Sequence, residues 1–209
     1  EVVEKHKELF DYEKLKPPFE LNGKPFEISI ELTDDTPIRK RAWRLSPTKE
    51  AALDKHIDKL LKAGVIYPIH DSEYSAVCVL VKKNGRDPNS ELRVTTDYRR
   101  LNAKCKKYAF MQPTAQEMFN MTEGATMYSC VDLHSAFYAC AVKKEHQDRL
   151  AFSTHRGMFT YARMPQGFCN SPSWLAAGLT QLLMTPYTGP GPPEVRNKPC
   201  LGNICCCFV

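Results

Sequence analysis

A carboxylate at the end of an apolar segment is the first feature of this sequence that could carry out chemistry. Asp132 follows the apolar residues 127–131, and a short turn then leads to Phe137 and a second apolar run. Burial of a carboxylate is costly unless a cation or a metal ion compensates its charge. The sequence therefore predicts either a carboxylate held at the floor of a cleft, or an ordinary Asp that ends a strand or caps a helix.

Two cationic side chains lie on the two arms of a predicted hairpin. Lys83, or its neighbour Lys82, follows the strand predicted at 77–81, and Arg93 lies within the strand predicted at 92–96. A guanidinium fork and an ammonium group on neighbouring strands would together bind a triphosphate. A charged hairpin tip in solvent is the alternative, and these side chains taken alone favour that alternative.

A glutamine lies in a turn whose neighbours restrict the backbone. Gln166 is flanked by Pro165 and Gly167 within the segment RMPQGFCNSP, residues 163–172. Proline fixes φ, and glycine allows conformations that are closed to other residues. The backbone is therefore set by the neighbours, and the amide of Gln166 is left to contact a ligand. An ordinary strand-to-helix turn is the alternative.

Hydrophobic spacing and turn residues predict the elements that must position these side chains. Between Ser46-Pro47 and Gly64, apolar residues recur at helical intervals, which predicts a helix. The other predictions are a strand at 26–30, hairpins of 77–81 with 92–96 and of 151–153 with 158–162, helices at 114–121 and 171–183, strands at 127–131 and 137–142, and a loop at 186–199. Strands and helices interleave without a regular βαβ order, so the predicted fold class is α+β.

The bulk composition is that of a globular protein and does not identify a partner. The 209 residues are 43% hydrophobic and 25% charged, which is enough to build a sizeable core. The net charge of +5 tolerates a polyanionic partner without requiring one. No segment approaches the roughly 18 apolar residues of a membrane span, and the first residues lack the features of a secretory signal. We therefore expect an intracellular protein without a membrane partner.

The nine cysteines are odd in number and lack framework spacing, which favours a reducing setting over a disulfide scaffold. Four of them crowd the end of the sequence, at Cys200, Cys205, Cys206 and Cys207. A zinc site there would lack the usual paired spacing, and Val209 is not a usual last residue of a prenylation box. We therefore predict that the apolar run 204–209 is a buried strand.

Taken in chain order, the motifs resemble those of one family, the reverse transcriptases of LTR retrotransposons and retroviruses. The resemblance extends from about Thr36 to Val209, and its first three motifs are similar to the lead-in of gypsy-type elements. The motifs are Pro37-Ile38-Arg39, Arg44 to Pro47, Leu60 to Ile66, Leu80 to Lys83, Arg93 with Asp97 to Asn102, Val131 to Phe137, Met164 to Phe168, and Asn170-Ser171-Pro172.

The resemblance implies an RNA-directed DNA polymerase, a nucleotidyltransferase. In this family two magnesium ions clamp the primer 3′-hydroxyl and the incoming deoxynucleoside triphosphate. Asp132 matches the catalytic, metal-binding carboxylate, and the backbone carbonyl of Leu133 would help to hold the nucleotide's ion. Lys83 and Arg93 match the pair that grips the triphosphate.

Two further positions match residues that contact the incoming nucleotide. Gln166 matches the residue beneath it, and Phe137 matches the aromatic that excludes a ribose 2′-hydroxyl; the alternative for Phe137 is a core aromatic on a strand. Intron or telomere enzymes and RNA-directed RNA polymerases are rival families. They would explain Asp132 but not Lys83, Phe137 and Gln166 together.

The family's third landmark is an aromatic residue, one variable residue and then two aspartates. Phe208 and Val209 match its first two positions. We therefore expect these 209 residues to be cut one residue before the carboxylate pair and to be inactive alone. A non-catalytic relic, or a repurposed nucleic-acid-binding fragment, is the alternative function.

The resemblance also implies a domain organisation and partners. It predicts a connecting arm at 1–35 and a partial right-hand polymerase at 36–209 without its thumb, with fingers at about 36–106 and 140–170 and palm at about 107–139 and 171–209. The expected partners are an RNA or DNA template with its primer, deoxynucleoside triphosphates, and the protease, RNase H and integrase segments of a gypsy-type Pol polyprotein. Such polyproteins act in DNA integration, in the cytoplasm or in virus-like particles.

Overall fold

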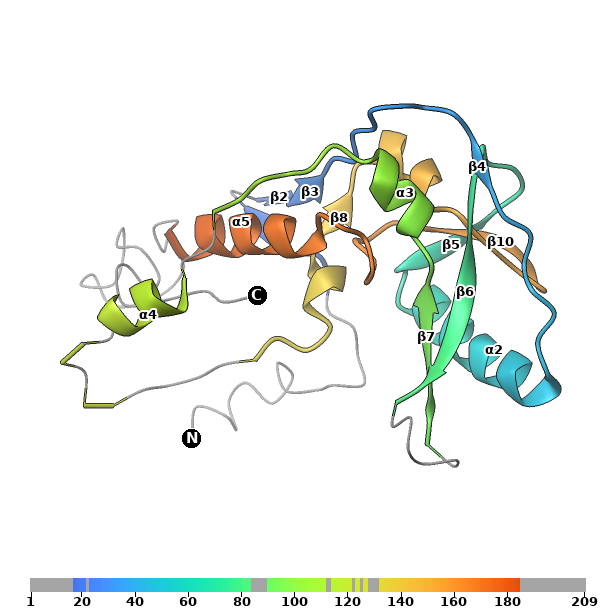
Figure 1. Cartoon of the computed structure of the whole chain (residues 1–209), viewed down its shortest axis with the longest axis horizontal. Helices are drawn as coiled ribbons and strands as arrows, with labels where there is room; N and C mark the ends of the chain where they lie inside the picture. Colours follow the sequence, from blue (N-terminus) through green and yellow to red (C-terminus); the bar gives the residue numbers. More distant parts are fainter. Residues whose placement is uncertain are drawn as a thin grey trace.

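The computed structural model describes residues 17–21, 23–83, 90–111, 114–121, 123–124, 126–127 and 132–184. Figure 1 shows two parts that lie beside one another. One holds the main sheet with helices α2 (Pro47–Lys62) and α3 (Arg99–Lys104), and the other is built around α5 (Ser171–Met184), with α4 (Ala115–Met121) near it. The strands of the sheet and the helices do not alternate regularly along the chain, which confirms the predicted α+β class.

The main sheet has six strands, and its longest strand, β6 (Tyr74–Lys82), has different neighbours along its two halves. The first half pairs in parallel with β4 (Ile38–Arg39) and β9 (Phe152–Thr154), and the second half pairs antiparallel with β7 (Leu92–Thr96). Beyond β9, the strands β10 (Gly157–Tyr161) and β5 (Ile66–Ile69) continue the sheet. Both predicted hairpins, β6–β7 and β9–β10, are confirmed, and β6–β7 extends out of the body of the sheet (Figure 1).

Helix α2 begins and ends where its sequence predicts. Ser46 is extended, and Pro47 occupies the first helical position, where a missing backbone N–H leaves no hydrogen bond unmade. Gly64, with φ of +62°, ends the helix, and its N–H donates to the carbonyl of Leu61. The helix packs against β5 and β7. Its buried side chains are Leu53, Ile57 and Leu60.

The part around α5 is held by short strands and stacked aromatic rings. Strand β3 (Glu27–Ile28) pairs in parallel with β8 (Ala141–Val142), and β1 (Glu20–Leu21) pairs with β2 (Lys24–Pro25). On α5, the ring of Trp174 stacks on Tyr108, with ring centroids 4.0 Å apart. This contact fixes the segment that follows α3 against α5, whose predicted span is confirmed.

The strand expected at 137–142 is wrong over its first part. Residues Ala136–Ala139 form a 3-10 helix, η2, and only β8 is extended. The cause is Ser135, which adopts the left-handed conformation with φ of 53° and turns the chain. Its carbonyl then accepts the N–H of Tyr138 at 3.0 Å, so hydrogen bonds within the segment replace those of a strand pair.

One connected apolar core joins the two parts. It includes Ile28 on β3 and Leu175 on α5, and Leu53 on α2 and Phe152 on β9. Residues 144–150 form a second 3-10 helix, η3 (Lys144–Leu150), which the sequence does not predict. Within the described ranges, none of the helices combines the length and the apolar character that a membrane-spanning helix needs. Most of the strand predicted at 127–131 lies outside the described residues, as do the loop at 186–199 and the run at 204–209.

Candidate active site

The register of the β6–β7 hairpin decides which lysine shares a face with Arg93. Val81 pairs with Arg93 and Lys82 pairs with Leu92, so Lys83 lies opposite Glu91, whose carbonyl accepts the Lys83 N–H at 2.9 Å. Side chains alternate between the two faces of a strand, and paired residues share a face. Lys83 and Arg93 therefore lie on one face, and Lys82 lies on the other.

Lys83 forms an ion pair at the end of this hairpin where the chain connects the two strands. Its Nζ lies 2.6 Å from Oε2 of Glu91, and both side chains are more than half exposed. The ammonium group holds the pKa of the Glu91 carboxyl below its usual range. An exposed ion pair contributes little to stability, so an incoming phosphate can replace the Glu91 carboxylate as the partner of Lys83.

Arg93 and Gln166 are in direct contact. The guanidinium Nη2 of Arg93 donates a hydrogen bond of 2.7 Å to the amide oxygen Oε1 of Gln166, across 73 residues of sequence. Gln166 is exposed, whereas Met164 and Phe168 on either side of it are buried. The turn is therefore anchored at both ends in the core and presents Gln166 to solvent beside Arg93.

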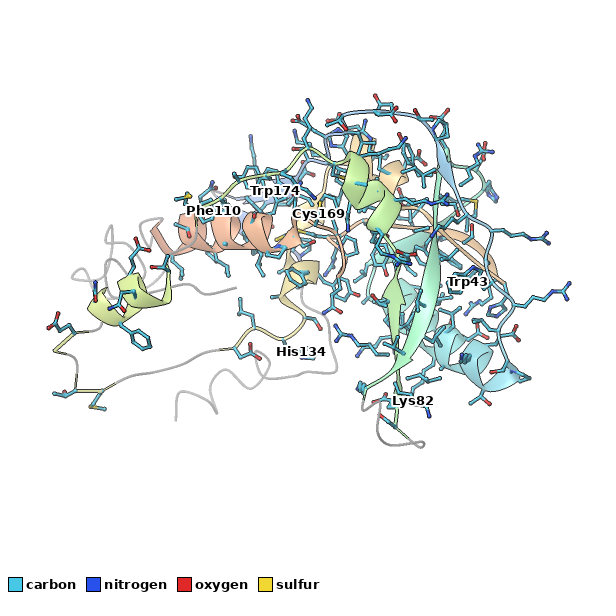
Figure 2. The ribbon with its side chains drawn as sticks, viewed as in Figure 1. Trp43, Lys82, Phe110, His134, Cys169 and Trp174 are labelled. Atoms are coloured by element: carbon cyan, nitrogen blue, oxygen red, sulfur yellow. The ribbon has the colours of Figure 1, made fainter. Side chains whose placement is uncertain are left out.

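Side-chain amides hold the backbone of this turn, a feature that sequence reasoning misses. Asn102 on α3 donates to the carbonyl of Gly167 at 2.8 Å and accepts the N–H of Cys169 at 2.9 Å. Asn170 donates to the carbonyl of Lys106 at 2.8 Å. In Figure 2, Cys169 lies where the start of α5 comes close to α3. The only sequence signal for this support is that Asn102 ends the motif Asp97 to Asn102 and that Asn170 begins the motif Asn170-Ser171-Pro172.

The 3-10 helix η2 carries Phe137 and places Tyr138 near Arg93. Phe137 is half-buried and packs against the core. Burial raises the pKa of Tyr138 to about 12, against the opposing effect of the Arg93 cation. Arg163 links η2 to the end of α2, because it donates to the carbonyls of Tyr138 and Ala63, each at 3.4 Å. Tyr138, which follows Phe137 on η2, thus lies near Arg93, and Arg93 in turn contacts Gln166.

Asp132 and Leu133 lie on the segment that leads into η2. Both are exposed, and Leu133 is 49% exposed. His134 lies on the same segment, just before η2 (Figure 2). In the part of the chain that the structure describes, no hydrogen bond or ion pair joins Asp132 to Lys83, Arg93 or Gln166. Phe208 and Val209 lie outside the described residues.

A buried carboxylate fixes the junction between β7 and α3. The side chain of Asp97 is 5% exposed; it accepts from Nε of Arg99 at 2.8 Å and from Nζ of Lys40 at 3.1 Å. The hydrogen bond from Arg99, and then that from Lys40, hold the pKa of Asp97 well below its usual range. This ion-pair network sets the direction in which α3, and with it Asn102, leaves the hairpin.

A cationic hollow lies beside α3, on the β4 side of the sheet. Its volume is about 550 Å³. Three of its lining residues are cations, Arg39, Arg100 and Lys104, and the others are Pro37, Ile38 and Ala103. Lys104 is paired with Asp34 at 2.7 Å, and Arg39 lies 3.7 Å from Asp71 in a more exposed pair. Among the described residues Arg100 has no anionic partner, so the hollow keeps a positive charge for an anionic ligand.

Comparison with known proteins identifies relatives over most of the chain. A family model described as reverse transcriptase (RNA-dependent DNA polymerase) matches residues 81–208. The Tf2-3 and Tf2-7 transposon polyproteins of Schizosaccharomyces pombe are each 32% identical over 164 residues, which is 77% of this chain and 12% of the relative. The chain therefore spans about an eighth of the length of these curated relatives.

Solved structures share the fold. The protease-reverse transcriptase of prototype foamy virus superposes with a TM-score of 0.71 at 24% identity, over 87% of this chain and 24% of that one. A foamy viral protease-reverse transcriptase in complex with an RNA/DNA hybrid superposes with a TM-score of 0.68 at 21% identity, over the same shares. At these identities the likeness concerns the fold alone.

Proposed function

Because this chain belongs to the reverse transcriptase (RNA-dependent DNA polymerase) family, we propose that it forms the fingers and part of the palm of an RNA-directed DNA polymerase. The parent protein would be a gypsy-type retrotransposon Pol polyprotein, since the transposon relatives are themselves polyproteins. The fingers would comprise about 36–106 and 140–170, and the palm about 107–139 and 171–209, with an arm at 1–35. The reaction is the transfer of a deoxynucleotide to a primer 3′-hydroxyl.

The contact between Arg93 and Gln166, with Lys83 on the same face of the hairpin, carries this proposal. Arg93 offers a planar fork and Lys83 a point charge, which together suit the oxygens of a triphosphate. Gln166 takes up one donor of Arg93 and leaves its own amide N–H groups for a nucleotide. A deoxynucleoside triphosphate would lie between the hairpin and the Gln166 turn, with its phosphates toward Lys83.

Asp132 and the backbone carbonyl of Leu133 would hold part of a magnesium site. Both supply oxygen ligands, which magnesium prefers, and magnesium sites often use one or two carboxylates with water and substrate phosphates. The described ranges contain no group of three His, Cys, Asp or Glu side chains that could form a complete site. When bound, divalent ions neutralise the charge that develops on the phosphates.

Phe137 would select the sugar. Its ring packs on the core from η2, next in sequence to Tyr138, which lies near Arg93, and it would form one wall of the site. A wall of this kind would collide with a ribose 2′-hydroxyl and accept a deoxyribose. The selection would therefore depend on the bulk of the side chain at this position.

The proposed nucleic-acid partner is a template with its primer. The hollow of Arg39, Arg100 and Lys104 supports it, because cations that contact phosphates supply affinity regardless of sequence. In the parent polyprotein, protease, RNase H and integrase segments would accompany this chain, in the cytoplasm or in virus-like particles. DNA integration would then follow synthesis.

Primer extension on an RNA template by the parent polymerase tests the proposal. We expect synthesis that requires magnesium and deoxynucleoside triphosphates and that Asp132→Asn abolishes. The same assay with Lys49→Ala, an exposed cation on α2, serves as a control for charge and folding. Absence of synthesis by the unmodified enzyme, or full activity of Asp132→Asn, would contradict the proposal.

A further inference from the structure

We propose that Asn102 is a positioning residue for Gln166, and so for the incoming nucleotide. The inference rests on the proposed function, because it assigns Asn102 a role only through a residue that contacts the nucleotide. Asn102 itself contacts backbone groups of the turn and not the site of the triphosphate. The geometry points to this role because one side chain makes two hydrogen bonds to the backbone that follows Gln166, one with Gly167 and one with Cys169.

The side chain of Asn102 behaves like a short piece of backbone. Its Nδ2 donates to the carbonyl of Gly167 at 2.8 Å, and its Oδ1 accepts the N–H of Cys169 at 2.9 Å. The two partners fix the orientation of the amide, because a carbonyl can only accept and an N–H can only donate. One side chain thus sets the direction of the backbone directly after Gln166.

The turn needs this support because its conformation is unusual. Gly167 has φ of +91°, and a Cβ there would lie 3.3 Å from the carbonyl oxygen of Thr96 on β7. The close approach brings the turn against the strand that carries Arg93. Ser171 adds a hydrogen bond of 3.0 Å from its hydroxyl to the carbonyl of Pro165. Without Asn102 the ends of the turn would remain anchored, while its middle, next to Gln166, would lose both polar contacts.

Asn102 is itself rigidly placed. Its backbone N–H donates to the carbonyl of Tyr98 at 2.7 Å, and α3 is anchored in the core by Leu101 and by Cys105, the residue that follows the helix. The hydroxyl of Tyr98 in turn donates to the carbonyl of Leu150 at 2.9 Å inside the core. Through Asn102 and Tyr98, the backbone next to Gln166 is therefore linked to the core of the sheet.

A double-mutant cycle in the parent polymerase separates positioning from general stability. We expect Asn102→Ala to lower kcat/KM for the deoxynucleotide about tenfold, since both side-chain hydrogen bonds to the turn are lost, yet less than about twofold when Gln166→Ala is already present. Asn102→Asp, which keeps the size of the side chain and the acceptor for Cys169 but loses the donor, provides a second variant should the alanine variant fold poorly.

Gln147→Ala is the matched control. The side chain of Gln147 also makes two hydrogen bonds, to the carbonyl of Val142 at 2.8 Å and from the hydroxyl of Tyr67 at 2.7 Å, but neither partner belongs to the Gln166 turn. Its effect on kcat/KM is expected to be the same with and without Gln166→Ala. Equal effects of Asn102→Ala in both backgrounds would overturn the inference and leave the proposed function standing. No synthesis by the unmodified enzyme would overturn both.

Discussion

The guanidinium of Arg93 and the amide oxygen of Gln166 are 2.7 Å apart, although the two residues are separated by 73 positions in the sequence. One lies on a hairpin arm and the other on a turn between a strand and helix α5. The contact fixes the distance between the hairpin and the turn. The two walls of the proposed nucleotide site are thereby pre-arranged, which lowers the entropy that binding must overcome.

The two neighbouring lysines should differ in their effect on nucleotide binding. Lys83→Ala should raise the KM for the deoxynucleotide about tenfold, because it removes a charge from the face that carries Arg93. Lys82→Ala removes the same charge from the opposite face, and its KM should change less than about twofold. Steady-state incorporation of a single nucleotide measures both. Equal effects of the two variants would show that the face of the hairpin does not matter.

The cationic hollow beside α3 should contribute to nucleic-acid binding through charge alone. Arg100→Ala should weaken binding of a primer–template duplex and reduce the slope of log affinity against log salt by about one. The reason is that one phosphate contact fewer releases one counterion fewer. Fluorescence anisotropy over a range of salt concentrations measures the slope. The idea fails if Lys49→Ala, on α2 and outside the hollow, changes the slope as much.

Gly178 on α5 should resist substitution by alanine. A Cβ at this position would lie 2.5 Å from the ring of Phe19 and 2.9 Å from that of Phe26. Helix propensity alone favours alanine over glycine by about 1 kcal/mol, whereas overpacking of a core costs about 1–3 kcal/mol. The steric cost should win, so Gly178→Ala should lower the Tm. A Tm that rises would show that the two rings move aside freely.

Stability should fall on acidification because of His146. The Nδ1 of His146 accepts the N–H of Ile30 at 3.1 Å, and burial, followed by the nearby charge of Arg149, lowers the pKa of the imidazole. Since the folded-state pKa lies below the unfolded value, the contribution is complete above about pH 6.5 and is lost as the pH falls through the folded pKa. Thermal unfolding of the chain at a series of pH values between about 7.5 and about 5 measures this loss of stability. We expect the Tm to fall by about a few degrees.

The variant His146→Asn is the control for this pH-dependent loss of stability. Its Oδ1 can accept from Ile30 in place of Nδ1, and it does not titrate in this range. The fall in Tm should therefore be smaller than in the unmodified chain. A part should remain, because burial, aided by the charge of Lys59, also lowers the pKa of His56. Identical pH profiles would show that protonation of His146 has no effect on folding.

Local patterns predicted the elements on which the site is built, and long-range contacts could not be predicted from them. The helix of α2 and the β6–β7 hairpin follow from spacing and turn residues that lie close together in the chain. The choice between Lys82 and Lys83 depends on the register of the hairpin, which its loop and the packing of the sheet determine together. The pairing of Asn102 with Gly167 spans 65 residues, beyond the reach of any periodicity.

The segment after Asp132 shows why one prediction was wrong. A short apolar run does not distinguish a strand from a helix by its spacing. A single left-handed residue, Ser135, decides between them, and serine at that position carries no strong signal of this conformation. Phe137, a residue of the proposed site, was therefore expected on a strand, whereas it lies on a 3-10 helix.

The double-mutant cycle of Arg93 and Gln166 tests most directly the claim that the two residues form one nucleotide site. In the parent polymerase, Arg93→Ala and Gln166→Ala should each lower kcat/KM for the deoxynucleotide, about tenfold or more for the arginine. The double variant should lose clearly less than the product of the two single effects, because each variant already breaks the contact. Effects that multiply fully, or normal kinetics in either single variant, would contradict the account.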